Sequence, residues 1–171
     1  QMGRGHTVET YVAWVDRLRQ ACPEIAMASD FIVGFPGETE ADFQETLQLV
    51  DRLAFDHAYS FCFSSRPGTR AETMAGQVDG AVSSARLAIL QERLNAHQLQ
   101  RNRERVGRVE AVLVEGPAKK GSGELTGRTP GFRKVNFPGD PTLIGRIVPV
   151  RITEGLPNSL RGHLTNPFPT D

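Results

Sequence analysis

The sequence of 171 residues predicts an α/β first part followed by a small all-β barrel. Between residues 29 and 42, an apolar run, a turn with two glycines and a proline, and a helix-capping signal follow one another, which is typical of a strand, turn and helix unit. After residue 107, five short runs that alternate apolar and polar residues are separated by turn residues. Such runs are expected for a small, closed or partly open barrel.

The first predicted elements are a helix and a strand. Thr7 can cap the helix, and Pro23 ends it. Its apolar positions form one stripe, which consists of Val8, Tyr11, Val15, Leu18 and Cys22. The apolar run that follows, residues 29–33, is largely continuous, and this predicts a strand that is buried on both faces of a parallel sheet.

The turn at residues 34–38 cannot continue the strand, and its glycines let the backbone approach a ligand closely. It has neither the G-x-G-x-x-G spacing nor that of a phosphate loop, so a simple tight connection is the alternative interpretation. Thr39 and Asp42 then form a capping box for a second helix. Its apolar positions are Phe43, Leu47, Val50 and Ala54.

Residues 55–63 are rich in aromatic side chains and predict a second strand, which ends in the loop 64–69. If the two strands are parallel, both loops emerge at the same end of the sheet. Arg66 would then reach over the first turn and could bind a carboxylate, a phosphate or a ribose. A solvated turn arginine is the alternative interpretation.

A long helix is predicted from a cap at Ser83 or Ser84 to about Arg105, and Gly107 ends it. Its apolar positions are Ala85, Ala88, Ile89, Leu94 and Leu99. We expect a domain boundary close to Val106. The five predicted barrel strands cover residues 109–114, 125–128, 133–137, 145–153 and 159–164.

The formal net charge is zero, but the charges are unevenly distributed. Residues 1–100 hold eight arginines, no lysine and 13 acidic residues, a net charge of −5. Residues 101–171 hold nine arginines, three lysines and seven acidic residues, a net charge of +5. A basic second half favours binding to nucleic acid, although surface charge also separates without a functional reason.

The predicted barrel carries basic residues that alternate with apolar ones, and we expect one basic face to bind RNA, with a solubilised exterior as the alternative. These residues are Arg128, Arg133, Lys134, Arg146 and Arg151. Lys119 and Lys120 add charge in a glycine-rich loop. Phe137 could offer a surface on which a base stacks.

Cys22 and Cys62 lie 40 residues apart without the spacing of a metal site, and we expect both to be reduced and buried. We assign no metal ligand and no catalytic residue. No apolar run approaches the ~20 residues that span a bilayer, so we expect a cytoplasmic protein. The first residue is Gln1, and we expect the chain to be a piece of a longer protein.

Seven segments resemble, in order and spacing, the radical-SAM tRNA methylthiotransferases, in particular the MiaB type. They are residues 1–7 (QMGRGHT), 30–39 (DFIVGFPGET), 61–69 (FCFSSRPGT), 112–116 (VLVEG), 127–129 (GRT), 135–137 (VNF) and 158–162 (NSLRG). The resemblance covers essentially the whole chain, which makes it far more specific than any one motif.

The resemblance implies that residues 1–103 are the C-terminal part of a partial radical-SAM TIM barrel and that residues 104–168 are a TRAM domain, a small RNA-binding β-barrel. It implies S-adenosylmethionine as a cofactor and two [4Fe-4S] clusters in the parent enzyme. The implied cofactor-binding residues are Val33, Gly34, Phe35, Pro36, Gly37, Glu38, Ser64 and Arg66. Arg128, Lys134, Asn136 and Phe137 fall in the matched motifs of the RNA-binding barrel.

The implied activity is methylthiolation of C2 of N6-isopentenyladenosine next to the anticodon, with the tRNA anticodon stem-loop as partner and a monomeric enzyme. The cluster-binding cysteines of the family lie upstream of the matched region, so we expect the chain alone to be inactive. Phe63 stands where the family usually has tyrosine. The alternatives are a methylthiotransferase that acts on a ribosomal protein and a non-enzymatic RNA-binding module. The tRNAs served and the sulfur donor do not follow from the sequence.

Overall fold

The computed structural model describes residues 5–119 and 123–165. The chain divides into two compact units between Leu94 and Asn95, and each is described by itself. In the described part of the chain, no helix combines the length and the apolar character needed to cross a membrane.

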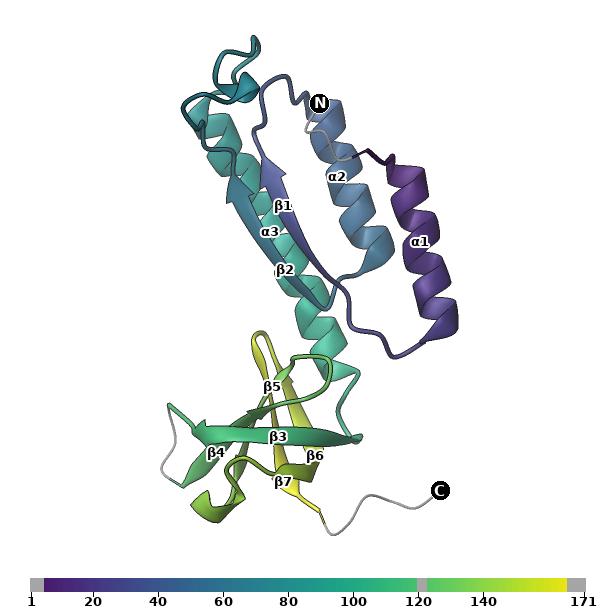
Figure 1. Ribbon diagram of the computed structural model, residues 1–171, viewed down its shortest axis with the longest axis vertical. Coiled ribbons are helices and arrows are strands. Elements are labelled where there is room, and N and C mark those ends of the chain that lie inside the picture. The colour runs from purple at the N-terminus through teal and green to yellow at the C-terminus, as the bar shows by residue number, and fades with distance from the viewer. Residues whose placement is uncertain (1–4, 120–122, 166–171) are drawn as a thin grey trace. The chain divides into compact units, whose positions relative to one another are not determined.

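The first unit contains helices around two parallel strands (Figure 1). The elements are α1 (Val8–Ala21), β1 (Ala28–Val33), α2 (Glu40–Leu53), β2 (His57–Cys62) and α3 (Gly80–Arg103), with a short 3-10 helix at Arg70–Glu72. Of α3, the residues up to Leu94 belong to this unit. The register of the strands runs from Ala28 opposite His57 to Val33 opposite Cys62. The predicted parallel pair of strands is confirmed.

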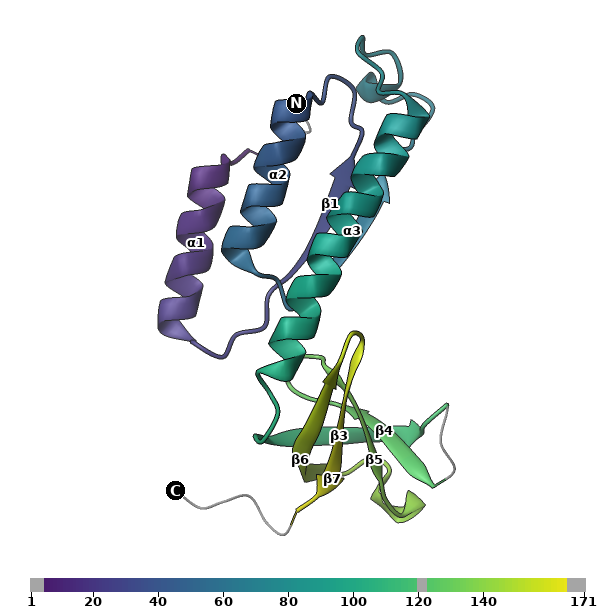
Figure 2. The ribbon, with the colours of Figure 1, turned by 180° about the vertical axis from the view of Figure 1, so that it is seen from behind.

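The two-stranded sheet is covered by helices on one face only. Figures 1 and 2 show α3 on one side of the strands, and Phe31 and Val33 are buried on that face. Ile32, between them, is 40% exposed, as are Tyr59 (68%) and Phe61 (53%) of β2. The prediction that the first strand is buried on both faces is therefore wrong for the described residues, because they supply cover for a single face.

The helices match the predicted stripes to different degrees. In α2, Phe43, Leu47 and Val50 are buried as predicted, and Leu53 joins them. Ala54 instead forms the C-cap, with a left-handed backbone at φ 44°. In α1 the buried residues are Val12 and Val15, whereas three members of the predicted stripe, Val8, Leu18 and Cys22, are exposed. The helix is rotated relative to the prediction, and the expectation of a buried Cys22 is wrong.

Helix α3 begins earlier than predicted. Asp79 caps it: its Oδ1 accepts hydrogen bonds from the backbone N–H of Ala81 at 2.8 Å and of Val82 at 3.4 Å. Neither Ser83 nor Ser84 is the cap, and Ser83 is buried inside the helix. The buried apolar residues of the helix are Leu90 and Leu94, whereas Ile89 is exposed.

The second unit contains a closed five-stranded barrel, as the sequence predicts. Its strands are β3 (Val109–Pro117), β4 (Glu124–Arg128), β5 (Lys134–Pro138), β6 (Ile147–Leu156) and β7 (Ser159–Leu164), with a 3-10 helix at Pro141–Leu143. The order around the barrel is β3-β4-β5-β7-β6, and β6 pairs with β3 to close it. The core consists of Val112, Val114, Leu125, Val135, Phe137, Val148, Val150, Ile152 and Leu160.

Candidate functional site

The loops that follow β1 and β2 lie together at the carboxyl ends of the two strands, as predicted. The Phe63 N–H donates to the carbonyl oxygen of Val33 at 2.7 Å, which continues the strand pairing into the loops. The Phe35 and Phe63 rings contact each other edge to face, with centroids 5.2 Å apart. Because Phe63 packs through its ring, this contact does not need the hydroxyl of the tyrosine that the resemblance leads one to expect.

The turn at residues 34–38 is folded around Gly34. This residue has φ +75°, a region that favours glycine, and its N–H donates to Oε2 of Glu38 at 2.7 Å. A Cβ at Gly34 would lie 2.2 Å from Oγ of Ser83, so the first turns of α3 occupy the space that the missing side chain leaves. Gly37 in turn donates to the carbonyl oxygen of Gly76 at 2.8 Å. The close approaches at both glycines are thus made by the chain itself.

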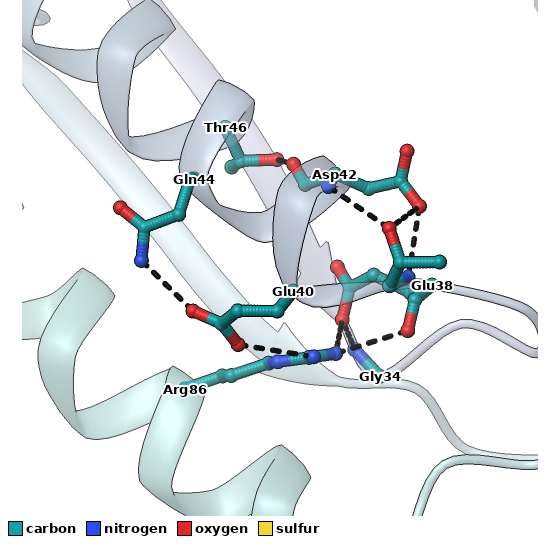
Figure 3. Close-up of polar contacts among 8 residues, drawn as sticks. Gly34, Glu38, Glu40, Asp42, Gln44, Thr46 and Arg86 are labelled. Atoms are coloured by element: carbon teal, nitrogen blue, oxygen red, sulfur yellow. Dashed lines mark hydrogen bonds and ion pairs between the residues drawn. The ribbon is translucent and has the colours of Figure 1, made fainter.

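Arg86, which follows Ser83 on the buried face of α3, also fixes this turn (Figure 3). Its Nη1 lies 2.8 Å from Oε2 of Glu38 and 3.2 Å from the backbone oxygen of Glu38. Its Nη2 lies 3.2 Å from Oε2 of Glu40. The side chains of Arg86 and Glu38 are only 9% and 10% exposed, whereas that of Glu40 is 67% exposed. The guanidinium also lies over the Phe43 ring, 5.5 Å from its centroid.

The N-terminus of α2 holds further negative charge close to Arg86. The backbone N–H and the hydroxyl of Thr39 donate to the carboxylate of Asp42 and lower its pKa. A hydrogen bond from Gln44 lowers the pKa of Glu40, to which Arg86 also contributes. The capping box predicted from Thr39 and Asp42 is confirmed.

The sequence did not reveal Arg86. The Arg66 side chain is exposed and makes no hydrogen bond or ion pair within the described residues, and its reach over the first turn stays a prediction. The signal for Arg86 was available. Ser83, Arg86, Leu90 and Leu94 recur at steps of three and four on the buried face of α3, and a charge at such a position needs a partner.

The predicted cofactor-binding residues differ in what they offer a ligand. The side chains of Val33 and Pro36 and the backbone of Gly34 are buried. Phe35 is half-buried, the Glu38 side chain is about nine-tenths buried, and Gly37, Ser64 and Arg66 are exposed. A nucleoside cofactor needs a ring surface and backbone polar groups, and the half-buried Phe35 and Phe63 beside the open turn fit one wall of such a pocket.

The described residues contain no set of side chains that could bind an iron–sulfur cluster. No group of three or more His, Cys, Asp or Glu side chains that could hold a metal ion occurs there. Cys22 and Cys62 are both free cysteines. The described residues therefore fit a wall of a nucleoside pocket and do not fit a cluster.

On the barrel, the residues of β4 and β5 with even numbers point outward. Arg128 lies opposite Lys134 in the strand pairing, and Thr126 lies opposite Asn136. Asn136 in turn pairs with Arg161 of β7. We call these five residues the basic barrel face. Glu115 lies 3.1 Å from Nε of Arg128, whereas Lys134 forms no ion pair with any described residue.

Two predicted RNA-binding residues point the other way. Phe137 is fully buried in the barrel core and cannot offer a stacking surface, so that prediction is wrong. Arg133 is only 4% exposed, and its place on an exposed basic face is also wrong. Both have odd numbers and lie on the inward side of the strand with Val135, since neighbouring residues alternate across a strand. Lys119 is exposed, and Lys120 lies outside the described residues.

Comparisons with known proteins identify both parts of the chain. Residues 103–165 match the family model described as the TRAM domain. A protein from Magnetococcus marinus named tRNA-2-methylthio-N(6)-dimethylallyladenosine synthase is 64% identical over 163 residues, which are 95% of this chain and 37% of that relative. The chain belongs to the tRNA methylthiotransferase family.

Other relatives with the same name agree. The relative from Chromohalobacter salexigens is 51% identical over 97% of the chain and 38% of its own length. That from Xanthomonas campestris is 48% identical over 95% of the chain and 34% of its own length. The chain thus spans little more than a third of the length of these tRNA methylthiotransferases, and the resemblance that the sequence suggested is confirmed.

Proposed function

We propose that the chain is the C-terminal part of a radical-SAM enzyme that methylthiolates C2 of N6-isopentenyladenosine next to the anticodon of tRNA. The observation that carries this proposal is the 64% identity, over 95% of the chain, to a relative that is named for this product. Because the chain corresponds to 37% of that relative and holds no cluster ligands among its described residues, we expect it to be inactive by itself.

The open face of the two-stranded sheet supports a role inside a larger barrel. Ile32, Tyr59 and Phe61 are side by side on it, since Ile32 pairs with Phe61 and Tyr59 lies two residues along the strand. Contiguous exposed apolar surface usually marks a face that another part of the protein covers or a place where a ligand binds. We infer that further strands of the parent enzyme extend this sheet and that the face lines the interior.

S-adenosylmethionine, when bound, would supply both the radical that activates the substrate and the methyl group of the product. We propose that the exposed backbone at Gly37 and the ring pair of Phe35 and Phe63 form one wall of its pocket, with Ser64 and Arg66 at the rim. Glu38 and Arg86 position the turn: Glu38 accepts from the Gly34 N–H and from Arg86, so its carboxylate is engaged within the protein. Their role is positioning and not proton transfer.

The barrel supplies the RNA-binding surface in this proposal. The TRAM match and the basic barrel face support it. Binding of the full 171-residue chain to a tRNA anticodon stem-loop is measured over a salt series, and we expect the affinity to fall steeply as salt rises. An affinity that does not depend on salt, or no binding, would contradict the proposal.

The activity is tested with the longest reading frame that contains this chain. It is expressed in a bacterial strain whose tRNA lacks the methylthio group, and nucleosides from tRNA are analysed by mass spectrometry. We expect the 2-methylthio product to appear. Methylthiolated aspartate in a ribosomal protein would instead support the ribosomal-protein enzyme, and no product of either kind would support an RNA-binding module.

We also propose that the enzyme is a monomer and that it works in the cytoplasm. Size-exclusion chromatography of the active preparation tests the monomeric state.

A further inference from the structure

An exposed aromatic ring stands at the turn between β4 and β5. Phe132 is 70% exposed and has φ +62°, a backbone conformation that side chains other than glycine rarely adopt. The turn is closed by hydrogen bonds from the Phe132 N–H to the Thr129 carbonyl oxygen at 2.9 Å and from the Thr129 N–H to the Arg133 carbonyl oxygen at 3.0 Å. The Arg133 N–H also donates to the Thr129 hydroxyl at 3.2 Å. The ring is therefore presented by a well-defined turn and is not held there by burial.

Arg128 supports the ring. Its guanidinium carbon lies 5.9 Å from the centroid of the Phe132 ring, and Nη1 lies 3.5 Å from the Phe132 carbonyl oxygen. Glu115 holds the same guanidinium through Nε at 3.1 Å. We call Phe132 and Arg128 together the aromatic platform.

The platform adjoins positive charge that nothing in the described chain neutralises. Lys134 lies directly opposite Arg128, and like charges at opposite positions of two strands destabilise a sheet. Glu115 offsets the charge of Arg128. Cations beside an exposed ring are the combination with which proteins bind single-stranded nucleic acid.

We propose that an unpaired RNA base stacks on Phe132 while the phosphates next to that base contact Lys134 and Arg128. This inference rests on the proposed RNA binding and adds a named residue and a preference for unpaired nucleotides. RNA suits the site better than a protein partner does, because the cations Arg128 and Lys134 adjoin the ring. The exposed Leu113 lies on the other side of Arg128 in the strand pairing. Duplex RNA is excluded from this role, since its bases are already stacked and paired.

The test compares Phe132→Asn with the unchanged chain, both as full 171-residue proteins. Asn tolerates the left-handed conformation, so the variant removes the ring without adding strain. Binding to a single-stranded oligonucleotide and to a duplex of the same sequence is measured over a salt series. We expect Phe132→Asn to weaken single-strand binding about 5- to 100-fold, as expected for the loss of one stacked base, and to leave the salt dependence unchanged. Val106→Thr, which alters an exposed apolar side chain outside the barrel strands, should leave the affinity unchanged.

A second variant reports on the stack directly. Trp14 is the single tryptophan of the chain, so Phe132→Trp combined with Trp14→Phe places one fluorophore on the platform. We expect single-stranded RNA to quench its fluorescence and duplex RNA to leave it unchanged. If the unchanged chain binds no RNA, the proposed RNA binding fails and this inference with it. If that chain binds and Phe132→Asn binds equally well, or if the fluorescence does not respond, RNA binding stands and the inference is overturned. A tryptophan that responds to a protein partner and not to RNA overturns it too.

Discussion

Arg86 and Glu38 show at the scale of single residues how the turn after β1 is held. Both side chains are about nine-tenths buried, and the carboxylate also accepts the N–H of Gly34. A buried ion pair adds little net stability compared with well-packed apolar residues, because both charges lose their hydration. Removing one partner alone is costly, since the other charge then stays buried without compensation. The pair therefore specifies the shape of the turn more than it stabilises the unit.

This gives a first prediction, on Glu38 and its neighbour Glu40. Glu38→Ala should lower the free energy of unfolding by about 3 to 5 kcal/mol, because the guanidinium of Arg86 stays buried and loses its buried carboxylate partner. Glu40→Ala removes the exposed partner of the same arginine, and its unfolding midpoint in urea should stay close to that of the unchanged chain. Equal midpoints for the two variants would contradict the assigned role of Glu38.

A second prediction separates backbone strain from overlap at the glycines. Gly34 and Gly68 both have positive φ, but only Gly34 would place a Cβ against another residue, Ser83. Gly68→Ala should cost about 1 to 2 kcal/mol, for strain alone. Gly34→Ala should cost a further 1 to 3 kcal/mol or so, because the start of α3 has to move. Urea unfolding of both variants measures the difference. If Gly34→Ala lowers the free energy of unfolding less than Gly68→Ala does, the start of α3 moves without the expected loss of stability.

At the scale of elements, the sequence located the three α-helices and seven strands of the described chain, but it did not show the buried face of each of them. The stripe of α2 followed from its period, because Phe43, Leu47 and Val50 are apolar and the opposite face is polar. In α3 the buried face includes Ser83 and Arg86, whose polarity hides the pattern. Only their partners in the turn after β1 explain why these residues lie inside, and a partner about 50 residues away is not visible in local periodicity.

The cap of α3 provides the third prediction. Asp79→Ala removes the acceptor of the first backbone N–H groups and should cost about 0.5 to 2 kcal/mol in urea unfolding. Ser84→Ala is the matched control, since Ser84 is exposed within the helix and is not its cap. A greater loss of unfolding free energy in Ser84→Ala than in Asp79→Ala would contradict the assignment of Asp79 as the cap and support Ser84.

The capping box of α2 gives a fourth prediction, on pH. The Thr39 N–H holds the pKa of Asp42 below its ordinary 3.8, so the charged form stabilises the folded state. This contribution is present above the pKa of 3.8 that the group has when unfolded, and it is lost as pH falls from there through the lower folded pKa. Asp42→Asn should therefore be less stable than the unchanged chain at neutral pH and approach it in acid.

The control for this pH dependence is Glu45→Gln. Glu45 is exposed on the same helix and makes no hydrogen bond or ion pair among the described residues. At neutral pH, Glu45→Gln should change the urea midpoint less than Asp42→Asn does. A difference for Asp42→Asn that stays constant with pH would contradict the assigned role of the Asp42 carboxylate.

At the scale of the whole molecule, the order of elements and the barrel were predictable, because turn residues and period-two patterns are local signals. Alternation within β5 also contained the information that Phe137 lies inside with Val135, and giving Phe137 a surface role set that signal aside. Phe132 could not be found in this way. Its exposure depends on a turn with positive φ, and a phenylalanine in the sequence does not predict such a turn.

The uneven charge of the two halves leads to the last prediction. If the +5 half binds RNA through the basic barrel face, the position of a charge should matter and not only the net charge. Lys134→Glu and Arg17→Glu change the net charge equally, but Lys134 lies on the barrel face and Arg17 is exposed on α1. Lys134→Glu should weaken RNA binding strongly at low salt and reduce the slope of log affinity against log salt by about 1 or more. Arg17→Glu should change neither quantity appreciably. Equal effects of the two substitutions in a fluorescence titration would mean that net charge alone attracts the RNA, and that the barrel face is not its binding site.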